Sequence, residues 1–460
     1  MSTPSPKRIE NALYPEHLEH LGGYREGILT ARTVRREGKV TQMIGELIEA
    51  YNPGSAVGSL CTVYNPDTEQ RVMAEVVGFR DGKILLMTLG QMPGIGPRCR
   101  VIPEHRSPMV RVGEPLLGRV LDGLGDPIDG LGEIVCNYEM PLYADPINPL
   151  HRRRIHEPID VGVRVINGLL TCGRGQRVGV MSASGVGKSV LIGMMARHTN
   201  ADVNVIAMIG ERGREVLEFI ERDLGPEGLK RSVVIAATSD HPPLVRTRAA
   251  FMATTIAEYF RNEGKHVLFM MDSITRFAMA QRETGLAAGE PPTTKGYPPS
   301  VFTALPRLLE RSGMSAAAGS ITSFYTVLVE GDDPNEPIAD AVRSVVDGHV
   351  MLSRNLAMRG QFPAVDVLGS TSRVMVDVIG KQHKIDAQRF ISTLATYQEA
   401  EDLINIGAYI RGSNPRIDYA LSKIDDIIDF IKQPVEEAAS VGQAEARLRQ
   451  IFSDYPETHT

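Results

Sequence analysis

The sequence of 460 residues contains no tryptophan, and only 5% of its residues are aromatic. Its four cysteines form no CxxC pair and accompany no histidine cluster, so neither a zinc site nor a disulfide framework is indicated. No apolar run approaches the roughly 20 residues that cross a bilayer, and the N-terminus carries no apolar signal core. We therefore expect a soluble, intracellular protein with reduced thiols.

An excess of basic charge is also missing. The formal net charge is −6, which argues against a protein whose main task is to coat nucleic acid. Proteins that bind single-stranded nucleic acid usually do so with aromatic side chains that stack on the bases. The only aromatic residues in 27–97 are Tyr51, Tyr64 and Phe79. With 42% apolar residues and this length, we expect two or three globular domains.

The first part of the chain has the pattern of short strands. The segment RVMAEVVGF (71–79) alternates, and KILLMTL (83–89) is a short apolar run that follows the turn signal Asp81-Gly82. Several such strands within about 70 residues are typical of a small closed barrel. We assign residues 25–100 to this β-barrel domain.

The middle of the chain alternates apolar runs with segments of helix length. The runs cover residues 176–181, 203–210, 231–238 and 266–272. Repetition of strand, helix and strand predicts a parallel sheet with helices on both faces. Residues 101–375 are therefore expected to form an α/β domain.

The two ends of the chain differ from this α/β pattern. Apolar residues recur at helical spacing over 417–431, so residues 376–460 are predicted to form a helical domain. Residues 1–24 carry apolar residues at helical spacing in a polar segment, which fits either a short amphipathic helix or a frayed tail.

The segment SASGVGKS (182–189) is close to a phosphate-binding loop, whose usual pattern is Gly, four residues, Gly-Lys, and Ser or Thr. Ser182 replaces the first glycine, but the chain is only leaving its strand there, so a small residue is expected to be tolerated. An apolar strand precedes the loop and a helix follows it, which aims backbone N–H groups at a phosphate. Lys188 would reach the β- and γ-phosphates, and the Ser189 hydroxyl would bind magnesium. The predicted nucleotide-binding residues here are Ser184, Gly185, Val186, Gly187, Lys188, Ser189 and Val190.

Three charged residues could complete a hydrolytic site. Asp272 ends the apolar run VLFMMD, where a carboxylate can hold magnesium through water, although such a residue also commonly caps a turn. Glu211 ends the strand that follows the loop helix and is the candidate general base, unless it is a surface partner of Arg212. Arg373 either stabilises charge on the γ-phosphate or serves as a structural ion-pair partner.

These residues lie in longer motifs that resemble one known family. GVGKS, GERGREV, MMDSITRFAMAQRE, GLAAGEPPTTKGYPPSVFTALPRLLERSG, VLVEGDDPNEPIAD and FPAVD with the following STS are similar to the ATPases of flagellar and type III protein export. That family belongs with the catalytic β subunits of rotary ATP synthases, and the likeness covers about residues 27–430. It implies a RecA-like phosphate-loop core with a parallel sheet, a small N-terminal β-barrel and a C-terminal helical domain.

The resemblance also implies roles for individual residues. Lys188 and Ser189 would hold the phosphates of ATP and Mg²⁺, and Asp272 would bind the same ion through water. Glu211 would be the catalytic carboxylate, and Arg212 would be a partner that faces the phosphates.

Three further positions are implied in the same way. Arg373 would act in trans, entering the site of a neighbouring copy, which implies a homohexameric ring. Phe362 and Tyr409 match positions where the superfamily packs aromatic rings around adenine, although both could instead be ordinary core residues.

The function implied by the resemblance is Mg²⁺-dependent ATP hydrolysis that energises type III protein export. The hexamer would release chaperones and help to feed unfolded cargo to a membrane export gate. Implied partners are a dimeric stator-like regulator at residues 1–24, a central stalk protein, and chaperone–cargo complexes at the helical domain after Ile417; no nucleic acid is expected. The implied location is the cytoplasm, peripherally at the inner membrane.

The motifs favour some of the alternative functions over others. FIERDLGPEGLKRS and RGQFPAVDVL favour a flagellar system over the injectisome of virulence-type secretion, and GERGREV favours export over a synthase catalytic subunit. A ring-shaped nucleic-acid motor shares this kind of core and is a further alternative. The presence of Glu211 argues against a ring subunit that binds nucleotide for structure only.

Overall fold

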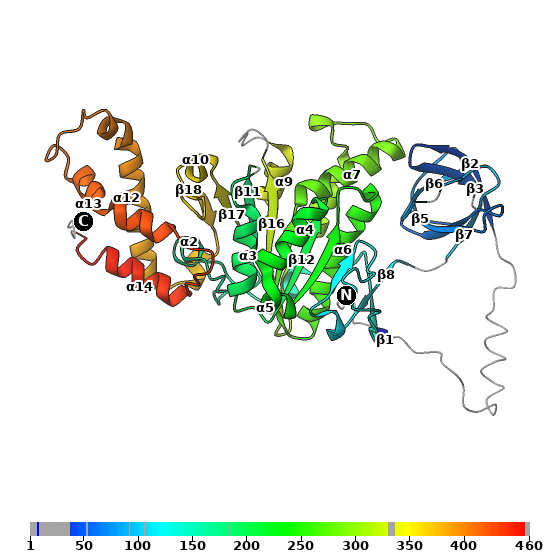
Figure 1. The fold of residues 1–460 in the computed structure, drawn as a ribbon, viewed down its shortest axis with the longest axis horizontal. Coiled ribbons are helices and arrows are strands. Elements are labelled where there is room, and N and C mark those ends of the chain that lie inside the picture. The colour runs from blue at the N-terminus through cyan, green and yellow to red at the C-terminus, as the bar shows by residue number, and fades with distance from the viewer. Residues whose placement is uncertain are drawn as a thin grey trace, which may run out of the picture.

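The structure is a computed structural model that describes residues 7–8, 37–51, 54–91, 93–104, 107–183, 185–329 and 336–455. Figure 1 shows three parts in a row, with a barrel at one end, an α/β domain in the middle and helices at the other end. The expected barrel, α/β core and helical region are therefore confirmed. The expected helix in residues 1–24 lies outside the described residues, apart from the backbone of 7–8.

Within the described residues, six strands close the barrel in the order β2–β3–β6–β5–β4–β7. Alternation along the strands turns small and branched side chains such as Val63 and Ala74 into the interior, as expected of a narrow barrel. The last barrel strand crosses residue 100, where we expected the domain to end. The bounds are β2 (Gly38–Ile44), β3 (Leu47–Tyr51), β4 (Leu60–Tyr64), β5 (Arg71–Arg80), β6 (Lys83–Thr88) and β7 (Arg100–Pro103).

The barrel is attached to the α/β domain by apolar and ionic contacts. Leu85 on the outside of β6 shares an apolar cluster with Leu244 at the start of α6 (Pro243–Asn262). Arg248 of the same helix donates to Glu75 Oε2 of β5 at 2.5 Å. A small antiparallel sheet of β1 (Lys7–Arg8), β10 (Tyr138–Pro141) and β8 (Met109–Val112) packs beside α6.

The central sheet has nine strands among the described residues, and its main order is β18–β17–β11–β16–β14–β12–β13–β9. Its strands pair in parallel, as expected, except that β18 and the short β15 are antiparallel to their neighbours. The bounds are β9 (Val120–Asp122), β11 (Arg177–Ser182), β12 (Val203–Ile209), β13 (Ser232–Ala237), β14 (His266–Asp272), β15 (Gly313–Met314), β16 (Ser320–Leu328), β17 (Gly348–Leu352) and β18 (Val365–Ser372).

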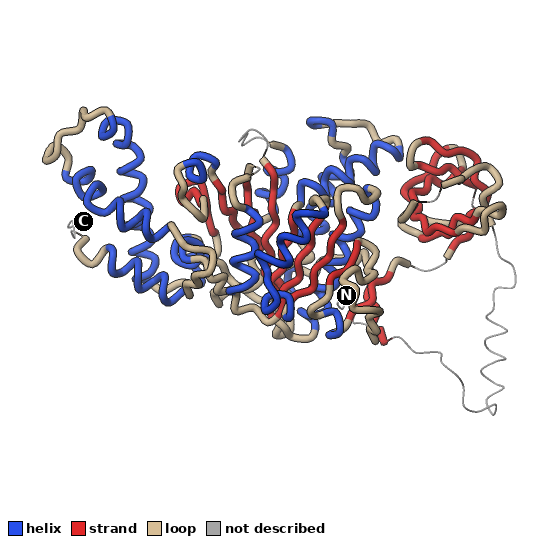
Figure 2. The backbone as a smooth tube through the Cα atoms, viewed as in Figure 1, coloured by secondary structure: helices blue, strands red, loops and turns tan. Residues whose placement is uncertain are grey.

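Helices cover both faces of this sheet, as Figure 2 shows. Along β12, Val205 and Ala207 join the core under α6 to α9, whereas Ile206 and Met208 join the core under α2 to α5. This near-continuous apolar pattern is typical of a parallel strand buried on both faces. The helices are α2 (Arg164–Leu169), α3 (Lys188–His198), α4 (Gly213–Glu218), α5 (Gly225–Lys230), α7 (Ile274–Ala288), α8 (Pro299–Leu309), α9 (Pro337–Val345) and α10 (Arg354–Met358). A π-helix at Phe219–Leu224 joins α4 to α5, and short 3-10 turns lie at Glu114–Leu116, Pro149–His151 and Thr294–Gly296.

The C-terminal helices pack on α2 and close the end of the core. Phe390, Phe430 and Phe452 form an aromatic cluster that is continuous with the apolar core around α3. The elements are α11 (Met375–Val378), α12 (Lys381–Asn405), α13 (Pro415–Ile431) and α14 (Val441–Ile451). None of the helices in the described part of the chain is both long and apolar enough to span a membrane.

Candidate functional site

The predicted phosphate-binding loop joins the end of β11 to the start of α3. Gly185 and Gly187 have φ angles of 80° and 87°, the left-handed region that favours glycine. Ser182 is instead a regular strand residue, paired in register with Leu328 and Leu352. The first glycine of the usual pattern is therefore not needed here, because extended backbone suits any residue. Ser184 lies outside the described residues.

Three charged side chains meet beside this loop. Lys188 Nζ donates to Asp272 Oδ1 and lies 3.5 Å from Glu211 Oε1. Asp272 ends β14, Glu211 follows β12, and these strands are neighbours in the sheet. Thr326 of β16 donates its hydroxyl to Asp272 Oδ1 at 2.7 Å, which fixes that carboxylate from the other side. The structure thus brings Lys188, Glu211 and Asp272 together at the carboxyl edge of the sheet.

Burial and the neighbouring charges shift the pKa values of the side chains in this cluster. Glu211 is only 8% exposed. Burial and the negative charge of Asp272 raise the pKa of Glu211 from 4.5 to about 7, against the opposing effect of Lys188. Burial lowers the pKa of Lys188, but the charges of Asp272 and Glu211 outweigh it, so that pKa is raised. Glu211 can therefore exchange a proton near neutral pH while Lys188 stays cationic.

The residues around Lys188 fit a magnesium ion that arrives with the phosphates of a nucleotide. Mg²⁺ prefers oxygen ligands and is usually held by one or two carboxylates together with substrate phosphates. The buried Asp272 carboxylate and the Ser189 hydroxyl in the first turn of α3 supply such oxygens. Glu211 Oε1 is buried and is ion-paired with Lys188 Nζ at 3.5 Å, but it has no well-aligned hydrogen-bond donor among the described residues, so it can accept a proton from a water.

Arg212 and Val190 flank the cluster. The Arg212 side chain is 81% exposed and forms an ion pair with Glu215, with 3.2 Å between Nη1 and Oε1. In the single chain it therefore points to solvent at the start of α4, next to Glu211. Val190, in the first turn of α3, packs partly buried against the core.

Arg276 is a candidate that we did not predict from the sequence. It lies in the first turn of α7, just after Asp272, and its Nε is buried without a hydrogen-bond partner in the described part of the chain. A Cβ at Gly210 would lie 2.8 Å from the Cβ of Arg276, so glycine allows this side chain to pack beside Glu211. A guanidinium whose Nε–H is buried and unpaired can bind a phosphate oxygen. The sequence feature that could have pointed to Arg276 is an arginine one helical turn after an aspartate that ends a strand.

Phe362 lies next to the loop. Its ring is 49% exposed, and its Cδ1 lies 3.6 Å from where a Cβ of Gly187 would be. The ring borders a cleft of about 760 Å³ that Arg164, Gln433 and Pro434 also line. The backbone N–H of Gln433 donates to the Phe362 carbonyl at 3.0 Å. An exposed ring beside a phosphate loop and a cleft of this size suit a purine base.

Tyr409 lies elsewhere, in the connection between α12 and α13. Its hydroxyl donates to the Asn414 carbonyl and to Asp418 Oδ1, both at 3.0 Å. These bonds hold the connection itself, and the described contacts of Tyr409 include none with Phe362 or Gly187.

Arg373 lies at the opposite end of the sheet from the loop. β18 runs antiparallel to β17. Val365, at its start, pairs with Leu352 near the loop, whereas Ser372, at its end, pairs with Gly348. The exposed Arg373 therefore follows β18 at the end where β11 begins. The sequence pattern alone did not reveal that β18 is antiparallel, and this direction separates Arg373 from the Lys188 of its own chain.

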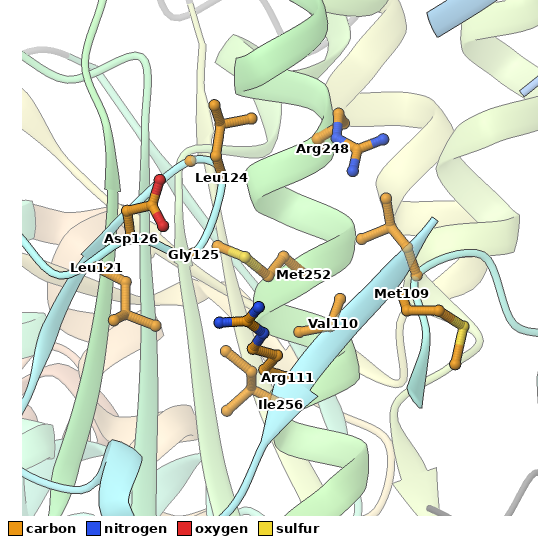
Figure 3. Close-up of a pocket in the computed structure, with 12 residues that line it drawn as sticks. Met109, Val110, Arg111, Leu121, Leu124, Gly125, Asp126, Arg248, Met252 and Ile256 are labelled. Atoms are coloured by element: carbon orange, nitrogen blue, oxygen red, sulfur yellow. The ribbon is translucent and has the colours of Figure 1, made fainter. Parts of the chain in front are cut away.

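A second cavity of about 270 Å³ lies away from these residues, between β8, the turn after β9 and α6. Figure 3 shows Arg111, Asp126 and Arg248 around it, together with apolar side chains such as Met252. None of the predicted site residues that the structure describes lines it.

Known protein families match this chain in three successive parts. Residues 40–104 match the beta-barrel domain of the ATP synthase alpha/beta family, and residues 162–372 match the nucleotide-binding domain of that family. Residues 379–450 match the C-terminal domain of the type III secretion ATPase EscN.

Similar proteins also span almost the whole chain. A flagellum-specific ATP synthase of Bacillus subtilis is 54% identical and covers 91% of this chain and 95% of the relative. A type 3 secretion system ATPase of Xanthomonas euvesicatoria is 49% identical, covering 93% and 96%. The solved structure of the assembled ATPase EscN in complex with its central stalk EscO, from enteropathogenic E. coli, has a TM-score of 0.83 at 42% identity, covering 90% and 99%.

Proposed function

We propose, from the premise that this chain belongs to the flagellar and type III secretion ATPases of the ATP synthase alpha/beta family, that six copies form a ring that hydrolyses ATP at their interfaces. The family membership makes the chain an ATPase. The ring is supported by the solved structure of the relative EscN, which is described as assembled. It is also supported by the position of Arg373, which follows β18 at the end of the sheet away from the phosphate loop of its own chain.

The proposed reaction uses the residues that meet at the carboxyl edge of the sheet. The loop N–H groups and Lys188 hold the phosphates, and Arg276 adds a cation beside them. A water attacks the γ-phosphorus while Glu211 takes its proton, and the bond to the β-phosphate oxygen breaks to leave ADP. Arg373 of the neighbouring copy stabilises the charge that develops on the γ-phosphoryl oxygens.

Magnesium completes this site when it is bound. Ser189 and Asp272 would hold the ion, and it would neutralise charge on the phosphate oxygens. Asp272 is occupied by Lys188 in the structure, so we expect Lys188 to turn from Asp272 to the phosphates when nucleotide binds.

The observation that supports this proposal most directly is the state of Glu211. Its carboxylate is buried beside Lys188, one oxygen has no hydrogen-bond partner among the described residues, and its pKa is raised to about 7. A general base works best when its pKa is near the working pH. A carboxylate held for structure alone is better served by a full set of partners, because burial without them costs stability.

Replacement of Glu211 tests the proposal. We expect Glu211→Ala to lower kcat by about 100-fold or more, the usual range for loss of a general base, while a fluorescent ATP analogue still binds. Glu218→Ala is the matched control, because Glu218 is an exposed glutamate on α4 whose partner is Arg214. Near-normal turnover by Glu211→Ala would contradict the assignment.

We further propose that hydrolysis energises flagellar protein export. The higher identity to the flagellar relative, 54% against 49% for the type 3 secretion relative, supports the flagellar system over the injectisome. A central stalk is proposed as a partner because EscN is solved in complex with one. A regulator at residues 1–24, chaperone–cargo complexes at the helical domain, and a peripheral location at the export gate complete the proposal.

A further inference from the structure

Arg373 needs contacts beyond the strand ladder to hold its position. It follows β18, and the pairing of β18 with β17 is interrupted by a register shift between His349 and Met351. Only the pairs at Gly348 and His349 remain to hold the end of β18 near Arg373. The Arg373 side chain is exposed.

An ion pair at the start of β11 lies directly beside this end of β18. Arg177 Nε and Nη2 donate to Asp347 Oδ2 and Oδ1 at 3.1 and 3.2 Å, and the Arg177 backbone N–H donates to Oδ2 at 3.1 Å. The backbone N–H of Asp347 donates in return to the Arg177 carbonyl at 2.8 Å. Such a forked arginine–carboxylate pair fixes orientation as well as distance.

The Asp347 carbonyl oxygen transfers this fixed position to Arg373. It accepts the backbone N–H of Arg373 at 3.0 Å and Nε2 of Gln176 at 3.2 Å. Nε2 of Gln176 also donates to Ser372 Oγ at 3.1 Å, and that hydroxyl donates to the Thr171 carbonyl at 3.0 Å. The two residues at the end of β18 are therefore held from the strand that leads to the phosphate loop.

Two further features keep this arrangement rigid. A Cβ at Gly348 would lie 2.5 Å from the Thr371 carbonyl oxygen, so only glycine lets the two backbones approach this closely. Glu310 Oε2 lies 2.5 Å from Arg177 Nη1. Burial lowers the pKa of Arg177, but Asp347 and Glu310 outweigh it and the pKa is raised, so the guanidinium stays charged.

We propose that Asp347, held by Arg177, is the positioning residue that sets where the Arg373 guanidinium enters the neighbouring copy's site. This inference rests on the proposed function, in which Arg373 acts in trans. Asp347 contacts the backbone of Arg373, so its effect on turnover passes through that residue. A reacting group misplaced by about 1 Å costs on the order of 100-fold in rate. Loss of the pair should therefore lower kcat and leave ATP binding in the variant's own pocket intact.

The test combines two variants that are each impaired alone. An Asp347→Ala chain keeps its own pocket but presents a displaced Arg373, whereas a Glu211→Ala chain has an inactive pocket and presents a correctly placed Arg373. We expect Asp347→Ala alone to lose about tenfold or more in kcat with a KM for ATP close to wild type. In a random 1:1 mixture, roughly a quarter of the head-to-tail interfaces pair an intact pocket with an intact Arg373. The mixture should recover about that fraction of wild-type activity.

The reference is a mixture of Arg373→Ala with Glu211→Ala, which must recover activity if Arg373 acts in trans. If the reference recovers and the Asp347→Ala mixture does not, Asp347 supports its own pocket or fold, and the inference is overturned while the proposed function stands. If neither mixture recovers, the trans arrangement is wrong and both fail.

Two more variants separate positioning from general stability. Asp129→Ala is the matched control, because Asp129 makes the same forked pair with Arg119, at 2.7 and 2.8 Å, beside β9 at the other edge of the sheet. It should keep its kcat, and an equal loss there would overturn the inference. Asp347→Asn preserves the side-chain shape and provides the test if Asp347→Ala does not fold; it should show a smaller loss and the same recovery.

Discussion

Replacement of Glu211 by glutamine should make the nucleotide-free protein more stable above neutral pH. Glu211 is 8% exposed, and burial together with the charge of Asp272 raises its pKa from 4.5 to about 7. At about 1.36 kcal/mol for each pKa unit, this rise means that ionising Glu211 in the folded protein costs about 3 kcal/mol. Glutamine has the same shape and no charge, so Glu211→Gln removes that cost even though Lys188 loses one of its two partners.

The sign of the pH dependence follows from linkage. Below about pH 4.5 the carboxyl is protonated in both folded and unfolded chains, and the variant and wild type should be equally stable. Between pH 4.5 and 7 the folded protein keeps a proton that the unfolded chain has lost, so the wild type loses stability as pH rises. Above about pH 7 the full difference should be present.

Thermal unfolding from pH 5 to 8 without nucleotide measures this difference. A gain of about 3 kcal/mol corresponds to a melting temperature about 6–12 °C higher for a domain of about 200 residues. Glu218→Gln is the control, because Glu218 is exposed and its variant should show no pH-dependent gain. A Glu211→Gln protein that melts with the wild type at pH 8 would refute the reasoning that Glu211 is held at a cost to stability.

Three other predictions concern the base cleft and the ring. Phe362→Ala should raise the KM for ATP about tenfold, or about 1.4 kcal/mol in binding free energy, with little change in kcat. Steady-state kinetics would measure this change, and Tyr409→Ala in the same assay tests the other predicted base contact. Gln433→Leu should lower the free energy of unfolding by about 3 kcal/mol, measured by denaturant titration, because its side-chain amide bonds Arg164 N, Gly162 O and Glu437 O. ATPase activity per chain should rise with protein concentration as rings assemble, and a flat profile at the rate of the most dilute sample would contradict a shared site.

The part of the site that sequence pattern could locate is the part built from parallel strands. Glu211 and Asp272 each follow an apolar run, and the carboxyl ends of parallel strands meet at one edge of a sheet. Lys188 follows a third such run through its glycine-rich loop. Strand order was not needed to expect these three side chains at the same edge, and the structure brings them within a few ångströms. The barrel and the helical domain were also expected from local periodicity alone.

The remaining features depend on contacts between distant segments. Arg276 packs against Gly210, and Gln433 bonds to Gly162, so neither could be singled out from its own neighbourhood in the sequence. The antiparallel direction of β18 is likewise a tertiary property, because the order of apolar and polar residues in this segment does not indicate the direction in which the strand pairs. It decides on which side of the molecule Arg373 emerges.

One strand connects the two half-sites, the phosphate loop and Arg373, that a single copy contributes to the proposed ring. β11 begins at Arg177, which holds Asp347 and through it Arg373, and ends at Ser182, where the phosphate loop starts. At about 3.3 Å per residue these ends are roughly 16 Å apart, which no arginine side chain can bridge. This separation fits the proposed role of Arg373 in the site of a neighbouring copy. Because both half-sites are fixed to the same buried strand, the spacing between a copy's phosphate loop and its Arg373 is set within that copy, and each interface of the proposed ring would be completed by one neighbour.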